Sequence, residues 1–170
     1  AGKNTARNPS QQITEILPIS DAEFVTDGYI RVYQDARGRN KSEGEFVMNR
    51  PIIGPLNKTN VDESTDAYDT IDWLVKNVPE SNGKVGITGS SYLGFTSLVA
   101  TINPHPALKA SVPQSPMVDG WMGDDWFHNG AFRQPNFDYV TTMTVDGSDT
   151  NAVANGSGDD YSTFLAAGSA

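Results

Sequence analysis

The chain has 170 residues, a net charge of −9, two histidines and no cysteine. Binding to nucleic acids or to anionic membrane surfaces depends on clustered lysine and arginine, so the acidic balance excludes both as partners. Without cysteine there are no disulfides, thiolate metal sites or cysteine nucleophiles, and no run of 18 apolar residues is present that would cross a membrane.

The first sixty residues predict mostly irregular structure with one strand. Residues 1–23 are polar and weakly patterned, which is typical of a loop or an irregular start, and the first ten lack the apolar segment of a signal peptide. Residues 29–33 (YIRVY) are rich in β-branched and aromatic side chains and predict a strand. Residues 50–60 contain two prolines and a glycine, so we expect a loop there.

A helix is predicted next. Asp62 or Ser64 can cap its N-terminus, and the turn-forming residues 77–83 (NVPESNG) end it. Five acidic residues lie between positions 62 and 72, and we interpret them as a solvated face of this helix rather than as a metal site. The apolar face repeats at the spacing i, i+4, i+7 and i+11: Ala67, Ile71, Leu74 and Val78.

An alternation of strands and helices follows. Residues 85–88 (VGIT) predict a buried strand, a helix is expected from about Tyr92 to Thr101, and residues 107–116 predict another buried strand. Together with the strand at 29–33, this order predicts an α/β fold with a parallel sheet covered by helices.

The character of the sequence changes after Pro116. The chain becomes rich in aromatic residues without the alternation typical of strands, residues 144–160 predict a loop or linker, and residues 161–168 predict the start of a helix. Four aromatic side chains either line a pocket for an aromatic acyl group or pack a cap against the core: Trp121, Trp126, Phe127 and Phe132.

Ser91 lies at the turn between the strand at 85–88 and the helix that follows. A nucleophile elbow places a serine at such a turn, with small residues on both sides because the turn is crowded. Gly89 lies two residues before Ser91, but Gly94 lies three residues after it, so the motif is G-x-S-Y-x-G. The N–H of Tyr92, at the helix N-terminus, can help to hold the oxyanion of a tetrahedral intermediate. The alternative is an ordinary Gly/Ser turn that caps a helix.

A nucleophilic serine needs a base, and only two histidines follow it in the chain. His105 lies at the far end of the elbow helix, roughly 20 Å away at about 1.5 Å per residue, and is interpreted as a loop residue. His128 follows several aspartates, so the chain order permits it as a base, although a pocket-wall or surface role is favoured.

Three motifs together resemble the α-amino acid ester hydrolases, within the larger family of X-Pro dipeptidyl peptidases and cocaine esterase. The motifs are YQDARGRNKSEGEF, GSSYLGF and SPMVDGWMGDDWFHNGAFRQ. The resemblance implies a partial α/β-hydrolase core over residues 1–116 and the start of a helical cap over residues 117–170. In that family a jelly-roll domain follows.

The resemblance also implies roles for single residues. Ser91 matches the nucleophile, and Tyr92 matches the residue whose backbone N–H forms half of the oxyanion hole. Asp125 matches one member of an acidic cluster that holds the α-ammonium group of the substrate, with Asp124 as its neighbour. Leu93 departs from the glutamate usual in the ester hydrolases and is closer to the cocaine-esterase branch.

The resemblance places the catalytic acid and histidine beyond the residue matching Ala170, so we expect a fragment that is inactive alone. The expected parent enzyme cleaves α-amino acid esters through an acyl-enzyme on Ser91 and transfers acyl groups to amines such as β-lactam nuclei. It needs no metal or organic cofactor, is compatible with a homo-oligomer, and is expected in the periplasm or outside the cell. The alternatives are an X-Pro dipeptidyl peptidase or general carboxylesterase, and a catalytically inactive binding module.

Overall fold

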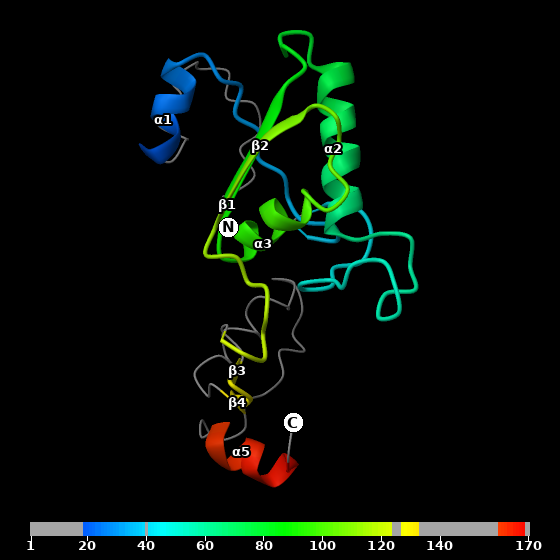
Figure 1. Ribbon diagram of the computed structural model, residues 1–170, viewed down its shortest axis with the longest axis vertical. Helices are drawn as coiled ribbons and strands as arrows, with labels where there is room; N and C mark the ends of the chain where they lie inside the picture. Colours follow the sequence, from blue (N-terminus) through cyan, green and yellow to red (C-terminus); the bar gives the residue numbers. More distant parts are fainter. Residues whose placement is uncertain (1–18, 40, 124–126, 133–159, 169–170) are drawn as a thin grey trace. The chain divides into compact units, whose positions relative to one another are not determined.

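The computed structural model describes residues 19–39, 41–123, 127–132 and 160–168 (Figure 1). The chain divides into two compact units, Ala1–Phe46 and Val47–Ala170, which are described separately. In the described part of the chain, none of the helices combines the length and the apolar character needed to cross a membrane.

The first unit contains a helix where the sequence predicted an irregular start. Helix α1 spans Ile19–Thr26, so the prediction for residues 1–23 is wrong over its last five residues. The carboxylate of Asp21, which is 6% exposed, accepts a hydrogen bond of 2.8 Å from the Arg31 guanidinium group. That guanidinium group also lies 4.8 Å from the centre of the Phe24 ring. These contacts between distant residues stabilise a short helix that local pattern does not predict.

The strand predicted at residues 29–33 is not formed. Among the described residues this segment has no hydrogen-bonded partner strand, and a strand cannot exist without a ladder. Its apolar side chains are largely exposed, with Tyr29 at 63% and Ile30 at 51%. Residues 29–33 therefore have the composition of a strand, but the described part of the chain offers them no strand to pair with.

The second unit begins with a loop and helix α2 (Glu63–Asn77). Of the two predicted candidates, Asp62 is the N-cap and Ser64 is not. The Asp62 Oδ1 accepts the Thr65 N–H at 2.9 Å, and the Thr65 hydroxyl accepts the Asp62 N–H at 2.9 Å. This reciprocal pair is a capping box. The Asp62 Oδ2 also accepts the Ile53 N–H at 2.8 Å, which ties the preceding loop to the helix.

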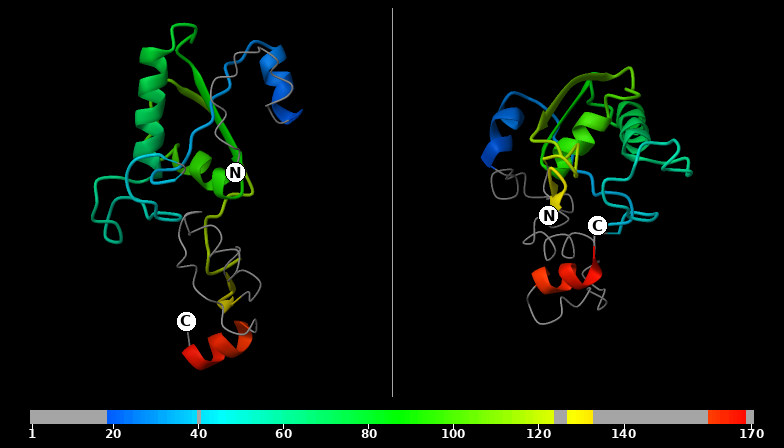
Figure 2. Two further views of the ribbon diagram at one scale, coloured as in Figure 1. Left: turned by 180° about the vertical axis from the view of Figure 1, so that it is seen from behind. Right: turned by 60° about the horizontal axis from the view of Figure 1, so that its bottom comes forward.

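A strand, a helix and a strand follow in the predicted order, but the predicted burial of both strands is wrong, because their residues are only half-buried or exposed. Strand β1 (Val85–Ser90) pairs in parallel with β2 (Leu108–Gln114), and α3 (Tyr92–Val99) connects them. Helix α3 packs against both strands, and α2 packs against α3 (Figure 1 and Figure 2). The buried apolar residues of this unit include Ile71, Tyr92, Val99, Ala100 and Met117. The α/β class predicted from the sequence is confirmed in this unit.

A short hairpin follows that the sequence analysis missed. Strand β3 (Phe127–His128) pairs antiparallel with β4 (Ala131–Phe132). The two residues between them, Asn129 and Gly130, have φ values of 50° and 80°, as a tight two-residue hairpin turn requires. The helix predicted at residues 161–168 is confirmed as α5 (Asp160–Ala167).

Candidate active site

Ser91 occupies a strained turn between β1 and α3. Its φ is 59° and its ψ is −119°, a conformation that costs a residue with a side chain about 1–3 kcal/mol and is common at functional sites. Two backbone hydrogen bonds hold it: the Ser91 N–H donates to the Gln114 carbonyl at 3.0 Å, and the Ser91 carbonyl accepts the Phe95 N–H at 2.9 Å. This is the strand–turn–helix geometry of a nucleophile elbow.

The two glycines around Ser91 are required by close approaches. A Cβ atom on Gly89 would lie 2.5 Å from the Cβ of Leu93, and one on Gly94 would lie 2.3 Å from the Gln114 carbonyl oxygen. Leu93 itself is 58% exposed. The contact with β2 therefore falls at the third residue after Ser91 and not at the second, which explains the spacing of G-x-S-Y-x-G.

The surroundings of Ser91 suit attack on a carbonyl group. Its side chain makes no capping hydrogen bond to α3, and the residue is partly buried. It follows the carboxyl end of a parallel strand, which is where open α/β sheets bind their ligands. Tyr92 begins α3, and the N–H groups in the first turn of a helix favour negative charge at that end.

The side chain of Tyr92 reaches back to α2. It is 9% exposed, its ring centre lies 6.3 Å from that of Phe95, and its hydroxyl donates to Glu63 Oε1 at 3.4 Å. The same oxygen accepts the Arg50 N–H at 3.3 Å, whereas Glu63 Oε2 is buried without a hydrogen-bond partner in the described part of the chain. Burial raises the pKa of Glu63, and the hydrogen bonds offset only part of this effect. Sequence analysis missed this link, because Glu63 and Tyr92 share no sequence pattern.

The interpretation of the acidic residues between positions 62 and 72 as a solvated helix face is wrong for the two at the start of α2. Asp62 is 2% exposed, and Glu63 is partly buried. Burial acts to raise the pKa of Asp62, but hydrogen bonds from Ser64, Ile53 and Thr65 outweigh it, so this pKa lies below its ordinary value. No group of three or more potential metal-binding side chains occurs among the residues that the structure describes.

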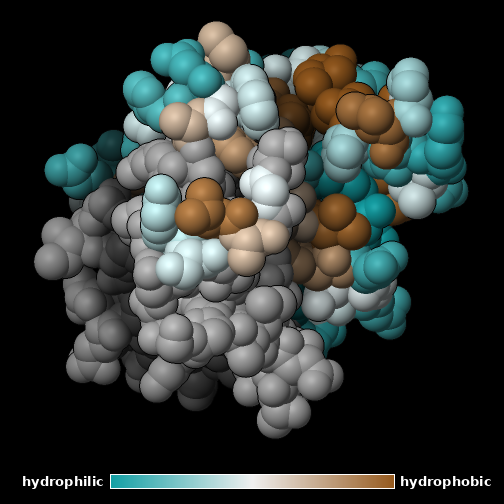
Figure 3. Space-filling model, turned by 90° about the horizontal axis from the view of Figure 1, so that it is seen from below, coloured by the Kyte–Doolittle hydropathy of each residue, from teal (hydrophilic) through white to brown (hydrophobic). Residues whose placement is uncertain are grey.

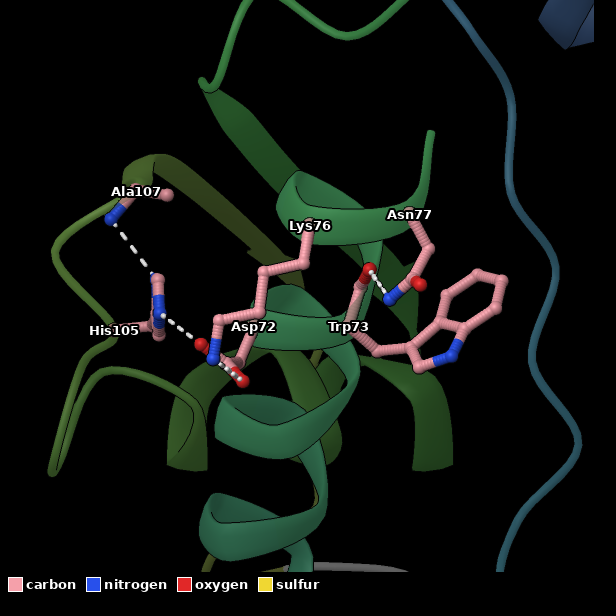
Figure 4. A network of polar contacts seen from close by, with 6 residues as sticks. All are labelled: Asp72, Trp73, Lys76, Asn77, His105 and Ala107. Atoms are coloured by element: carbon pink, nitrogen blue, oxygen red, sulfur yellow. Dashed lines mark hydrogen bonds and ion pairs between the residues drawn. The ribbon is translucent and has the colours of Figure 1, made fainter. Parts of the chain in front are cut away.

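His105 lies in the loop after α3, as predicted, and both of its ring nitrogens are engaged (Figure 4). Nδ1 accepts the Ala107 N–H at 3.1 Å, and Nε2 lies 3.5 Å from Asp72 Oδ1. The ring centres of Tyr68 and His105 lie 4.7 Å apart. Lys76 donates to Asp72 at 2.7 Å, and this hydrogen bond is the main cause that lowers the pKa of Asp72. His105 therefore joins the loop to α2 and is not placed to serve Ser91.

Of the other predicted site residues, His128 and Trp121 lie in the described part of the chain. His128 is exposed in the hairpin, and in the described ranges no hydrogen bond or ion pair joins it to Ser91. Asp124, Asp125 and Trp126 lie outside the described residues, so their roles stay predictions. Trp121 packs on Phe127 with ring centres 4.9 Å apart.

Large apolar side chains remain exposed on the strand–helix–strand unit and just after it, with Leu93 at 58%, Val112 at 53% and Val118 at 62%. Figure 3 shows apolar atoms at the surface among polar ones on one face of the molecule.

Comparisons with known proteins bear on this site. A model of the family described as X-Pro dipeptidyl-peptidase (S15 family) matches residues 2–170. The cocaine esterase of Rhodococcus sp. (strain MB1 Bresler) is 40% identical over 97 residues, which are 57% of this chain and 15% of that protein.

Two solved structures are more similar still. An α-amino acid ester hydrolase labelled with selenomethionine matches with a TM-score of 0.81 and 59% identity, over 96% of this chain and 27% of its own. An aminopeptidase from the marine sediment archaeon Thaumarchaeota archaeon matches with a TM-score of 0.76 and 53% identity, over 90% of this chain and 25% of its own. The chain thus spans about a quarter or less of the length of these proteins, and the resemblance stated from its motifs is confirmed.

Proposed function

The chain belongs to the X-Pro dipeptidyl-peptidase (S15) family, and from that premise we propose that it carries the nucleophile of a serine hydrolase acting on α-amino acid esters. One observation carries the proposal: Ser91 is held at φ 59° between a parallel strand and a helix N-terminus, with both flanking glycines in close contact. The 59% identity with an α-amino acid ester hydrolase supports the choice of substrate class.

In the proposed reaction, the Ser91 Oγ attacks the ester carbonyl carbon while a general base accepts its proton. The negative charge that develops on the carbonyl oxygen is stabilised by the Tyr92 N–H and by the positive end of α3. The alcohol then leaves with a proton, and an acyl-enzyme remains on Ser91. Water hydrolyses this ester, or an amine such as a β-lactam nucleus takes the acyl group.

The base is assigned to residues beyond these 170. His105 is engaged with Ala107 and Asp72, and His128 is exposed in the hairpin. We therefore place the catalytic histidine and its acid in the remainder of a longer protein, with residues 1–116 as part of the core and residues 117–170 as the start of a cap. The isolated chain should react slowly or not at all with a fluorophosphonate.

Asp125 is proposed to bind the α-ammonium group of the substrate. A carboxylate attracts a cation strongly where water is partly excluded, because the effective dielectric constant is low there. This group is shared by α-amino acid esters and by peptides with a free N-terminus. The 53% identity with an aminopeptidase therefore favours peptide cleavage as the second candidate. The similarity to the cocaine esterase and the leucine at position 93 favour a general carboxylesterase. Such an enzyme would not need Asp125.

The test compares an α-amino acid ester with the same ester lacking its amino group, using the complete protein. Ser91→Ala should abolish both turnover and fluorophosphonate labelling. Asp125→Asn should lower kcat/KM for the amino ester by about 10–100-fold and leave the other ester within about twofold. An equal loss on both esters would contradict the ammonium site, and labelling of Ser91→Ala at the wild-type rate would contradict the nucleophile.

A further inference from the structure

The carboxyl group of Glu63 is weakly hydrogen-bonded for a partly buried acid. Besides its own backbone N–H, the carboxylate is reached by the Arg50 N–H and the Tyr92 hydroxyl. These two hydrogen bonds are long, at 3.3 Å and 3.4 Å, and both reach the same oxygen. The other oxygen is buried and has no hydrogen-bond partner among the described residues. Its neighbour Asp62 instead accepts three hydrogen bonds of 2.6–2.9 Å through both oxygens.

This contrast separates the two acids by role. Asp62 stabilises the start of α2 and the loop before it. Glu63 keeps a partly desolvated carboxyl group with one unpartnered oxygen among the described residues, and such groups in native proteins call for an explanation. Burial raises its pKa, which agrees with the geometry. Within the described ranges, its side-chain partner is Tyr92, 29 positions along the chain and next to Ser91.

Tyr92 is placed to control the peptide that follows Ser91. A peptide unit is planar, so the direction of the Tyr92 N–H depends on ψ of Ser91 and φ of Tyr92. Ser91 is strained and keeps its conformation only while its surroundings hold it. The backbone hydrogen bonds of Ser91 hold one side of this peptide. On the other side, the Tyr92 ring is buried beside Phe95 and its hydroxyl is bound to Glu63.

We infer that Glu63 is a positioning residue: it holds the Tyr92 hydroxyl, and the tyrosine in turn keeps the Ser91–Tyr92 peptide N–H directed at the oxyanion. Glu63 touches neither substrate nor reacting atoms in this role. The inference rests on the proposed function of Ser91, because the oxyanion exists only if that serine attacks a carbonyl group.

The test uses the complete protein, with kcat expressed per Ser91 titrated by a fluorophosphonate. Glu63→Met removes both acceptors at similar volume and should lower kcat about tenfold, part of the loss seen when an oxyanion donor is deleted. KM should stay within about twofold, because the interaction is made in the transition state. Glu63→Gln keeps one acceptor and should restore most of kcat. Asp69→Asn, at an exposed acid on the same helix, is the control and should leave kcat unchanged.

A double-mutant cycle then tests whether Glu63 acts through the Tyr92 hydroxyl. Tyr92→Phe removes only the hydroxyl and should lower kcat about as much as Glu63→Met, and the double variant should be no worse than either. Additive losses, or a wild-type kcat in Tyr92→Phe, would overturn the inference. If Glu63→Met does not fold, Tyr92→Phe alone decides. Failure of the proposed function looks different, because the wild-type protein itself would then show no labelling of Ser91.

Discussion

Replacing Gly94 by alanine should disable the serine turn. The new Cβ would lie 2.3 Å from the Gln114 carbonyl oxygen and 3.2 Å from the Cα of Pro116. Ordinary contacts of this kind begin near 3.4 Å, so α3 or the end of β2 has to move by about 1 Å. Both partners are backbone, and neither can turn aside as a flexible side chain would.

The same carbonyl oxygen accepts the Ser91 N–H at 3.0 Å, so the movement also strains the bond that holds the serine. Overpacking costs about 1–3 kcal/mol, and a weakened hydrogen bond adds about 1 kcal/mol. Displacement of a reacting group by about 1 Å can lower a rate about 100-fold. We therefore expect Ser91 in Gly94→Ala to react with a fluorophosphonate about 100 times more slowly than in the wild type.

The assay measures the labelling rate and the thermal midpoint of the complete protein. Gly86→Ala is the matched control, because a Cβ on Gly86 would lie 3.8 Å from its nearest neighbour, the Ala110 carbonyl oxygen. It should keep the wild-type labelling rate. Wild-type labelling and an unchanged midpoint in Gly94→Ala would refute the close approach between α3 and β2 as the reason for this glycine.

Four further outcomes follow from local contacts. Asp62→Asn places an amide donor near the Ile53 N–H and should destabilise the start of α2 by about 1–3 kcal/mol, seen as faster hydrogen exchange. The folded-state pKa of Asp62 is lowered, so its contribution is complete above about pH 4 and is lost as the pH falls through the folded pKa. His105→Ala breaks the contact with Asp72 and should lower the thermal midpoint without slowing labelling of Ser91. Gly130→Ala, at φ 80°, should cost the hairpin about 1–2 kcal/mol, measured by amide exchange in β3 and β4.

The parts of the fold that the sequence predicted well are set by local signals. The capping of α2 by Asp62 depends on residues within a few positions of each other. The turn at Ser91 was predicted from Gly89 and Gly94 nearby, although the Gln114 carbonyl far along the chain also holds it. Strands β1 and β2 were recognised from short apolar runs, and their parallel pairing follows from the helix between them.

The failures have two physical causes. The segment at 29–33 had the composition of a strand, but a strand also needs a partner that local sequence cannot supply. The link between Glu63 and Tyr92 likewise joins residues 29 positions apart. The hairpin was different: Asn129 and Gly130 form a dipeptide typical of tight turns, and this local signal was overlooked because the flanking strands are only two residues long.

The positive φ of Ser91 implies that stability and catalysis place opposite demands on this position. Glycine adopts a positive φ freely, so Ser91→Gly would relieve about 1–3 kcal/mol of strain in the folded state. The greater freedom of glycine in the unfolded chain would cost only about 0.5–1 kcal/mol of stability. A search for thermostable variants that ignores activity would therefore tend to favour glycine here and would discard the proposed nucleophile. Any such search on this protein should hold position 91 fixed and seek its gains elsewhere.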